Sequence, residues 1–245
     1  MNYLRSSRFN ILPPVVKNLL IINVLLFLAT TTFYSIGFVD LNRTLGLYYW
    51  GSNNFESWQI ITHMFMHGGF THLFFNMFAI WMFGAQLENM WGSKRFLNYY
   101  ILTGFGAAFL HFIIIHFQIE NLENIMNQDT INTIRANGSE LLQNHRNYVD
   151  INMGRLNVLY HTPVVGASGA LFGILIAFGM LFPNTLLFFI FIPIPIKAKY
   201  FVLFYGLAEL FYGLQNNPSD NIAHFAHLGG MIFGFLIIKF WQNNR

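Results

Sequence analysis

The chain has 245 residues, of which 55% are hydrophobic and only 9% are charged. An average soluble domain has about a quarter charged residues, so this composition excludes an ordinary soluble domain and indicates a membrane protein. The absence of cysteine excludes disulfides and cysteine metal sites, and the formal net charge of +3, with scattered basic residues, does not favour nucleic acid as a partner.

Apolar stretches recur along the chain at the length of about 20 residues that a bilayer requires. Six of them are present, at 18–38, 58–87, 96–118, 166–183, 199–215 and 222–241. The first resembles a signal peptide, but no small-residue cleavage site follows it, so we expect an uncleaved span. The sequence therefore predicts an all-α, polytopic membrane protein with six transmembrane helices.

Basic residues are unevenly distributed between the loops. With the N-terminus inside, the short outside loops carry only Arg43, and the inside segments carry Arg5, Arg8, Lys17, Lys94, Arg95, Lys197, Lys199, Lys239 and Arg245. The positive-inside rule then predicts that both termini are cytoplasmic. The expected organisation is a cytoplasmic N-terminal segment (1–17), a six-helix membrane domain (18–241) and a cytoplasmic C-terminus (242–245).

Two connecting segments have distinct compositions. The polar segment at about 119–160 has apolar residues spaced as in an interrupted helix, namely Leu122, Ile125, Ile131 and Ile134. We expect a helical insertion at the outer surface rather than a second domain. The link 187–200 is apolar but contains Pro193 and Pro195, so we expect it to run extended along the inner membrane face without crossing.

Polar groups inside spans are costly in hydrocarbon and mark candidate functional positions. In the second span, His72 and Asn76 are four residues apart and share a helix face, where both can donate hydrogen bonds to a common point. Mutual pairing of the two is the alternative. His63 and His67 have the same spacing, and we expect them to satisfy one another and brace a loop.

The sixth span carries a stripe of small residues. Positions around the helix axis follow from its period of about 100° per residue. Measured from Gly230, Ala226 and Gly234 lie within about 40° around the axis, His227 lies near about 60° and His224 near about 120°. Small residues let neighbouring helices approach closely. We therefore expect His227 at the edge of a close helix contact and His224 pointing further away.

The fourth span carries a matching stripe of Gly169, Gly173 and Ala177. Packing the two stripes together brings Ser168 and His227 within reach of each other. A serine hydroxyl becomes a nucleophile when a base such as a neutral imidazole takes its proton, and no carboxylate is needed if helix packing orients that imidazole. Taken alone, Ser168 in a small-residue run is better explained by helix packing than by catalysis.

Three motifs taken together resemble the rhomboid family of intramembrane serine proteases, over about 58–118 and 164–238. The matching residues are His72 and Asn76 for H-x-x-x-N, Gly166, Ser168 and Gly169 for G-x-S-G, and Ala226, His227, Gly230 and Gly234 for A-H with its small-residue run. The resemblance implies a six-helix rhomboid-like bundle in a bacterial inner membrane. It implies cleavage of transmembrane-protein substrates within the lipid bilayer, with neither metal nor cofactor.

By the same resemblance, Ser168 is the nucleophile and His227 the general base. His72, Asn76 and the Ser168 backbone N–H would stabilise the oxyanion, and Gly166 and Gly169 allow close approach at the nucleophile. Two positions depart from the family pattern. Gln59 follows Trp58 where many members have arginine, and Phe172 can stack on the histidine but lacks the hydroxyl of the tyrosine found in some bacterial members.

Two acidic residues lie at or inside spans. Glu88 ends the second span, where we expect a structural hydrogen bond or ion pair. Glu209 lies inside the fifth span, where we favour structural pairing over a role in gating substrate entry.

Two other classes of function compete with a protease. The histidine pairs at 63–67 and 224–227 are similar to those of metal oxidases, but the further ligands of such sites are missing. A catalytically inactive relative that only binds membrane clients usually lacks the serine or the histidine, and both are present here.

Overall fold

The computed structural model describes residues 9–189, 192–215 and 223–244, and within these ranges the chain is mostly helical. Three of the described helices are long and apolar enough to cross a membrane: α1 (Pro14–Ser35), α6 (Ser93–Glu123) and α11 (His224–Asn243). The shorter α9 (Ser168–Leu181) is also apolar. Arg5, Arg8 and Arg245, which contributed to the topology prediction, lie outside the described residues.

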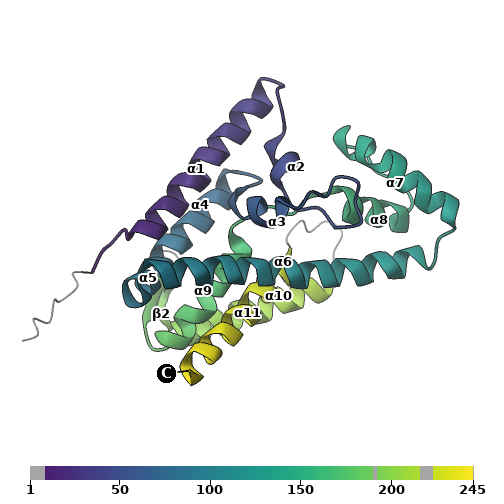
Figure 1. Cartoon of the computed structure of the whole chain (residues 1–245). Coiled ribbons are helices and arrows are strands. Elements are labelled where there is room, and N and C mark those ends of the chain that lie inside the picture. The colour runs from purple at the N-terminus through teal and green to yellow at the C-terminus, as the bar shows by residue number, and fades with distance from the viewer. Residues whose placement is uncertain (1–8, 190–191, 216–222, 245) are drawn as a thin grey trace, which may run out of the picture.

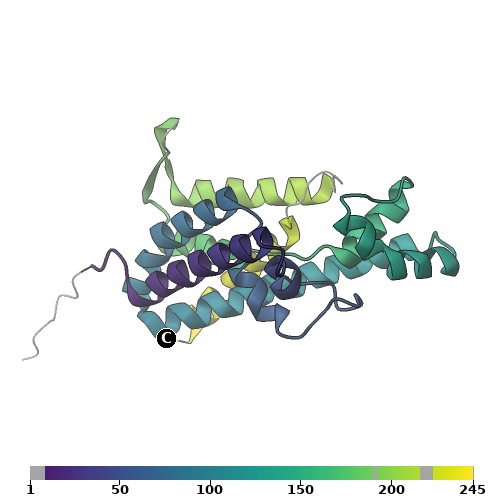
Figure 2. The same ribbon diagram turned by 90° about the horizontal axis from the view of Figure 1, so that it is seen from above.

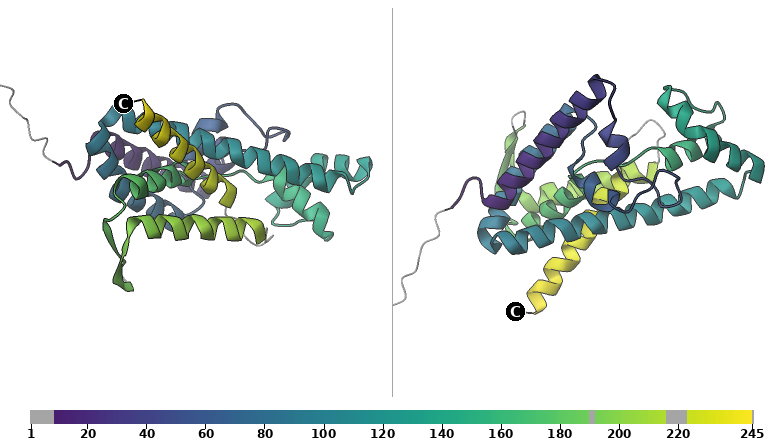
Figure 3. Two further views of the ribbon diagram at one scale, coloured as in Figure 1. Left: turned by 90° about the horizontal axis from the view of Figure 1, so that it is seen from below. Right: turned by 45° about the horizontal axis from the view of Figure 1, so that its top comes forward.

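The centre of the molecule is formed by α6, α9 and α11, which pack extensively on one another. Figure 1 shows α6 running along the molecule with α11 crossing it. The helix α10 (Ala198–Gln215) lies at the edge of this bundle, where it packs on α9 and α11, as the views from above and below show (Figures 2 and 3). Four of the apolar stretches expected from the sequence thus fall on α6, α9, α10 and α11.

The second expected span is not one helix. It begins with α3 (Gln59–Thr62) and a 3₁₀ turn at His63–Phe65, and a continuous helical stretch then starts at Phe70. That stretch consists of α4 (Phe70–Ala79), a π-helical turn (Ile80–Gly84) and α5 (Ala85–Trp91). The break lies at Gly68-Gly69, where Gly69 is fully extended with φ 178° and ψ 167°.

The helical turn that contains His63 ends at Phe65, and Met66 is extended, so His63 and His67 do not pair as we expected. The break at Gly68-Gly69 lies after both of them and before His72. His63 Nδ1 lies 2.8 Å from the backbone carbonyl oxygen of Gln59. Neither ring nitrogen of His67, which is buried, has a hydrogen-bond partner among the described residues. The spacing of four residues places two side chains together only when the helix continues between them.

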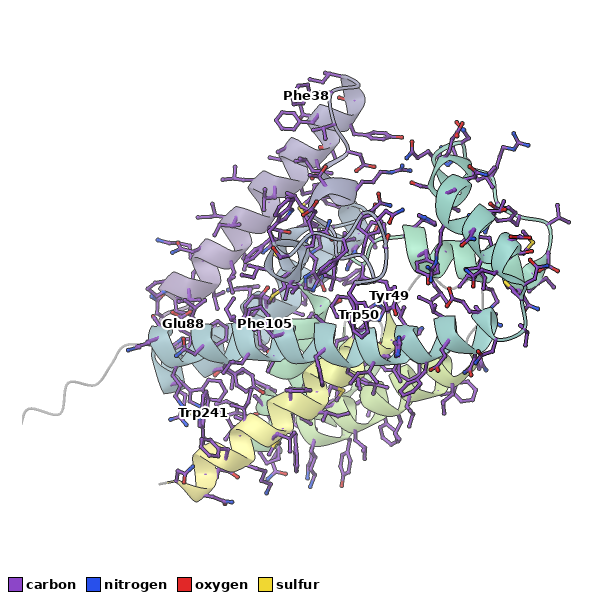
Figure 4. The ribbon with its side chains drawn as sticks, turned by 45° about the vertical axis from the view of Figure 1, so that its right-hand side comes forward. Phe38, Tyr49, Trp50, Glu88, Phe105 and Trp241 are labelled. Carbon is purple, nitrogen blue, oxygen red and sulfur yellow. The ribbon has the colours of Figure 1, made fainter. Side chains whose placement is uncertain are left out.

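The insertion at 119–160 is helical, as predicted, and forms a small core of its own. Its helices α7 (Gln128–Gln143) and α8 (Ile151–His161) extend beside the end of α6 (Figure 1). The core contains Tyr49, Ile119, Leu122, Ile131, Ile134, Leu156 and Tyr160, whereas Ile125 is 66% exposed. Tyr49 and the neighbouring Trp50 link this core to α6 through His116 and Phe112 (Figure 4).

The link between α9 and α10 differs from the single extended segment that we expected. It contains strands β1 (Leu186–Phe189) and β2 (Ile192–Lys197), which pair antiparallel with Leu187 opposite Ile196. The extended conformation imposed by proline is therefore present, but its backbone groups pair in a hairpin. This hairpin is the exception to an otherwise helical fold in the described part of the chain.

Glu88 makes the structural hydrogen bonds that we predicted. Its carboxylate accepts from the backbone N–H groups of Val15 at 2.9 Å and Val16 at 2.8 Å, and from Ser93 Oγ at 2.6 Å. It thus supplies acceptors to the first turn of α1, whose N-cap is a proline with no side-chain bond. Figure 4 shows Glu88 near the start of α1, with Phe38 beyond the other end.

Candidate active site

The backbones of α9 and α11 touch along the two predicted small-residue stripes. A Cβ atom added to Gly230 would collide with the carbonyl oxygen of Gly169, and one added to Gly234 would lie 3.1 Å from Gly173 Cα. Tyr99 on α6 donates a hydrogen bond of 2.7 Å to the Gly173 carbonyl oxygen beside this contact. Only glycine permits such an approach, which confirms the predicted contact between the stripes.

This contact brings Ser168 and His227 together. Ser168 is the first residue of α9 and His227 lies in the first turn of α11, and Ser168 Oγ is 2.8 Å from His227 Nε2. His227 is buried and Ser168 is partly exposed. The ring of Phe172, one turn after the serine, stacks on the imidazole with centroids 4.2 Å apart and planes 8° from parallel.

The segment that leads into Ser168 is tied to the rest of the site by its backbone. Val164 and Leu47 exchange two backbone hydrogen bonds of 2.9 Å, and the Gly166 N–H donates to the His63 carbonyl oxygen at 2.9 Å. Gly166 has φ +138°, a conformation that favours glycine. A Cβ there would lie 2.9 Å from the His72 ring and 3.3 Å from Ser168 Oγ, so both side chains border this glycine.

A buried donor lies one helical turn after His72. Asn76 is 4% exposed, and its amide nitrogen has no hydrogen-bond partner among the described residues. The first backbone N–H groups of α9, including that of Ser168, also have no intrahelical partner, and the positive end of the helix dipole lies there. The His72 ring and these N–H groups therefore offer hydrogen-bond donors close to Ser168, and Asn76 adds an unpaired one on the same helix as His72.

Gln59, which departs from the family pattern, organises the loop between α2 (Leu41–Leu45) and α3. Its side chain is buried and bonds four backbone groups: the N–H groups of Tyr48 and Glu56 at 3.4 and 3.1 Å, and the carbonyl oxygens of Thr44 and Asn54 at 3.3 and 3.0 Å. An amide can accept and donate at once, which suits it to bracing a loop through its backbone.

A carboxylate lies at the histidine, where we expected none to be needed. Glu209 Oε2 on α10 is 2.9 Å from His227 Nδ1 and 2.6 Å from His224 Nδ1. The expected structural pairing of Glu209 is therefore present, and its partners include the imidazole that faces Ser168. His224, which we expected to point further away, is directed at Glu209. The signal in the sequence was the carboxylate inside an apolar span.

Within the described ranges, these same three residues form a cluster of side chains that could hold a metal ion. The ligand atoms of Glu209, His224 and His227 lie within 4.8 Å of one another, and all three residues are buried. Two histidines and one glutamate are a ligand set that zinc enzymes use. Here both Nδ1 atoms are hydrogen-bonded to the carboxylate, an arrangement that satisfies the three groups by themselves.

Comparison with known proteins agrees with the arrangement of these motifs. The chain is 28% identical over 243 residues to the rhomboid protein YdcA of Bacillus subtilis (strain 168), which covers 96% of this chain and 94% of that protein. It is 26% identical over 220 residues to the rhomboid protease AarA of Providencia stuartii, covering 84% of this chain and 66% of that protein. With RHOMBOID-like protein 6, mitochondrial, of Arabidopsis thaliana it shares 26% identity over 183 residues, 74% of this chain and 43% of that protein. The Rhomboid domain model matches residues 54–242, most of the chain, and the chain therefore belongs to the rhomboid family.

Proposed function

We propose that the chain is an intramembrane serine endopeptidase, which hydrolyses peptide bonds in or next to transmembrane segments of other membrane proteins. The observation that carries this proposal is the distance of 2.8 Å between Ser168 Oγ and His227 Nε2. Membership of the rhomboid family, whose members include named proteases, supports the reaction class. The stacked ring of Phe172 supports it further, because it limits the tilt of the imidazole that must accept the proton.

In this mechanism Ser168 Oγ attacks the carbonyl carbon of the peptide bond while its proton passes to His227 Nε2. The tetrahedral intermediate collapses, the bond to nitrogen breaks, and His227 returns the proton to the departing amine. A water molecule then repeats the two steps on the acyl-enzyme, which releases the carboxylic acid and restores the serine. No metal or organic cofactor takes part in these steps.

The negative oxygen of each tetrahedral intermediate needs donors that are already in place. The proposed donors are His72, the amide of Asn76 and the backbone N–H of Ser168. The Asn76 amide nitrogen has no hydrogen-bond partner within the described ranges, which supports this role, since a buried polar group without a partner is rare and calls for an explanation.

The proposed membrane arrangement has six spans within 18–241, with the segments 1–17 and 242–245 in the cytoplasm and the 119–160 insertion outside. Large apolar side chains exposed on several helices support contact with lipid; they include Leu25, Leu28, Phe74, Phe75, Phe204, Leu207 and Phe211. The helical stretch from Phe70 to Trp91 supplies the second span. The bacterial inner membrane is the proposed location.

The test uses purified protein in detergent or liposomes with a reporter transmembrane substrate. We expect Ser168→Ala and His227→Ala each to abolish cleavage, and a fluorophosphonate probe to label the parent but not Ser168→Ala. If either variant cleaved the reporter as fast as the parent, the mechanism would be wrong. Reading the cleaved bond by mass spectrometry shows whether it lies in or beside the transmembrane segment.

A further inference from the structure

Glu209 joins two histidines in the interior of the bundle. Glu209, His224 and His227 are 5%, 8% and 9% exposed, and one carboxylate oxygen lies within hydrogen-bond distance of both Nδ1 atoms. An ionised carboxylate only accepts hydrogen bonds, so both Nδ1 atoms are donors. The Nε2 atom of His227 then carries a lone pair, and this is the atom that faces Ser168 Oγ.

We propose that Glu209 is a positioning residue for His227. Its carboxylate holds His227 in the tautomer whose Nε2 can accept the Ser168 proton, and its negative charge stabilises the imidazolium that forms when the proton moves. The inference rests on the proposed protease function and adds a third member to the pair of Ser168 and His227. Glu209 is not protonated in any step, because the proton stays on His227 until the amine leaves.

Two contacts restrain the imidazole in different directions. The face of Phe172 fixes the plane of the His227 ring, since the two rings lie 8° from parallel. Rotation within that plane is left to the hydrogen bonds at the edge of the ring, and Glu209 and Ser168 occupy the two nitrogen positions. The carboxylate therefore restrains a motion that stacking leaves open.

His224 holds the carboxylate in turn. Its bond of 2.6 Å to the same oxygen supplies a second donor, and Tyr212 stacks on the His224 ring with centroids 5.8 Å apart. A carboxylate in an apolar span is expensive unless it is paired, and in the low local dielectric its interaction with a nearby positive charge is stronger than in water. The arrangement therefore favours the charged transition state at His227.

The central experiment compares the parent with Glu209→Gln, which keeps the shape of the side chain but removes its charge. Removing the carboxylate that orients the base of a serine protease lowers kcat by up to about 10⁴-fold. We expect about a 100-fold loss here, because Phe172 still holds the ring and the glutamine oxygen can still accept a hydrogen bond. The KM for the reporter substrate should change little.

A second readout separates positioning of the base from substrate entry, since α10 lies at the edge of the bundle. A small fluorophosphonate reacts with Ser168 without docking a transmembrane segment, so Glu209→Gln should slow labelling by a similar factor. If the variant cleaved the reporter slowly but were labelled at the parent rate, Glu209 would act on substrate entry and the inference would be overturned.

The pH profile of labelling provides a third readout that a purely structural role would not move. Glu209→Gln removes a negative charge at hydrogen-bond distance from the imidazole, so we expect the pH dependence of labelling to differ between the variant and the parent. The other titratable groups around His227 are Ser168 on α9, His72 on α4, His111 on α6 and His224 on its own helix, and all are unchanged in the variant. A parent-like profile and rate would overturn the inference.

Folding and metal binding are checked with the same proteins. Leu210→Ala, at an exposed position on α10, is the matched control and should keep the parent rate.

If Glu209→Gln does not fold, Glu209→Asp takes its place. Aspartate is one methylene shorter and withdraws the carboxylate from His227, so labelling should slow at least tenfold. An unchanged rate overturns the inference. Activity that a chelator removes and Zn²⁺ restores would also overturn it, because the cluster would then be a metal site.

The failure of this inference differs from failure of the proposed function. If Glu209→Gln were fully active while Ser168→Ala were inactive, the positioning role alone would be wrong. If Ser168→Ala cleaved the reporter, the protease mechanism itself would fail.

Discussion

Replacing Gly230 by alanine tests whether the contact between α9 and α11 determines the geometry of the proposed active site. The added Cβ would collide with the Gly169 carbonyl oxygen and lie 2.9 Å from the carbonyl carbon, whereas ordinary contacts begin at 3.4 Å. Both neighbours are backbone atoms, so neither can rotate away. Bringing the Gly169 carbonyl oxygen out to an acceptable contact therefore requires the two helices to separate by about one ångström or more.

The size of the effect follows from this separation. Overpacking costs about 1–3 kcal/mol, and alanine recovers about 1 kcal/mol through its better helix propensity, so we expect a net destabilisation of up to about 2 kcal/mol. The distance between Ser168 Oγ and His227 Nε2, 2.8 Å in the structure, would lengthen by a similar amount. Since a misplacement of about 1 Å can lower a rate about 100-fold, we expect about a 100-fold lower kcat.

The assay measures kcat on the reporter substrate and the melting temperature in detergent. Gly206→Ala on α10 is the matched control, because its Cβ would meet only the flexible end of Met231, at 2.9 Å from Cε and 3.2 Å from Sδ. That variant should retain the activity and stability of the parent. Parent-like kcat and melting temperature in Gly230→Ala would refute the reasoning, as would an equal loss in Gly206→Ala.

Three further predictions concern separate parts of the molecule. Asn76→Ala should lower kcat by about 10²–10³-fold, as expected for loss of an oxyanion donor, without lowering the melting temperature, because the amide nitrogen has no partner to lose in the part of the chain that the structure describes. Glu88→Ala leaves two N–H groups of α1 and the Ser93 hydroxyl without their acceptor, so we expect a loss of about 2–4 kcal/mol in the free energy of unfolding with kcat unchanged. Burial lowers the pKa of His161 below its usual 6.5 in the folded protein, so the unfolded state binds the proton more tightly. The contribution of this residue to the free energy of unfolding therefore falls as the pH drops below 6.5. His161→Gln should therefore flatten this part of the pH dependence of the melting temperature.

Each of these predictions has a control or a contradicting result. A lower melting temperature with normal kcat in Asn76→Ala would make the amide structural. Glu120→Ala, at an exposed position on α6, is the control for Glu88→Ala and should leave stability unchanged. For the pH dependence, exposed His145 serves as the comparison, and His145→Gln should behave as the parent. An unaltered pH dependence in His161→Gln would assign it to other groups.

Local pattern was sufficient for several features of this protein. The lengths of the apolar stretches predicted helices that agree with α1, α6 and α11. This was possible because the free energy of moving a side chain into an apolar environment depends mainly on the chemistry of that side chain. The helix period placed Gly230 and Gly234 on one face, and the structure confirms their contact with α9. The hydrogen bonds of Glu88 were expected because it ends an apolar span.

Tertiary structure decided which partners the buried polar groups have. The end of the helical turn at Phe65 separated His63 from His67. The link between α9 and α10, which was expected to be a single extended segment, formed the paired strands β1 and β2. Glu209 stood out in the sequence as a carboxylate in an apolar span, but its bonds to His224 and His227 depend on how α10 packs against α11. The sequence alone determined which polar groups lie in apolar segments, where burial is unfavourable without a hydrogen bond. The packing of helices distant in the chain determined which partners those groups have, because a hydrogen bond depends on distance and direction in space.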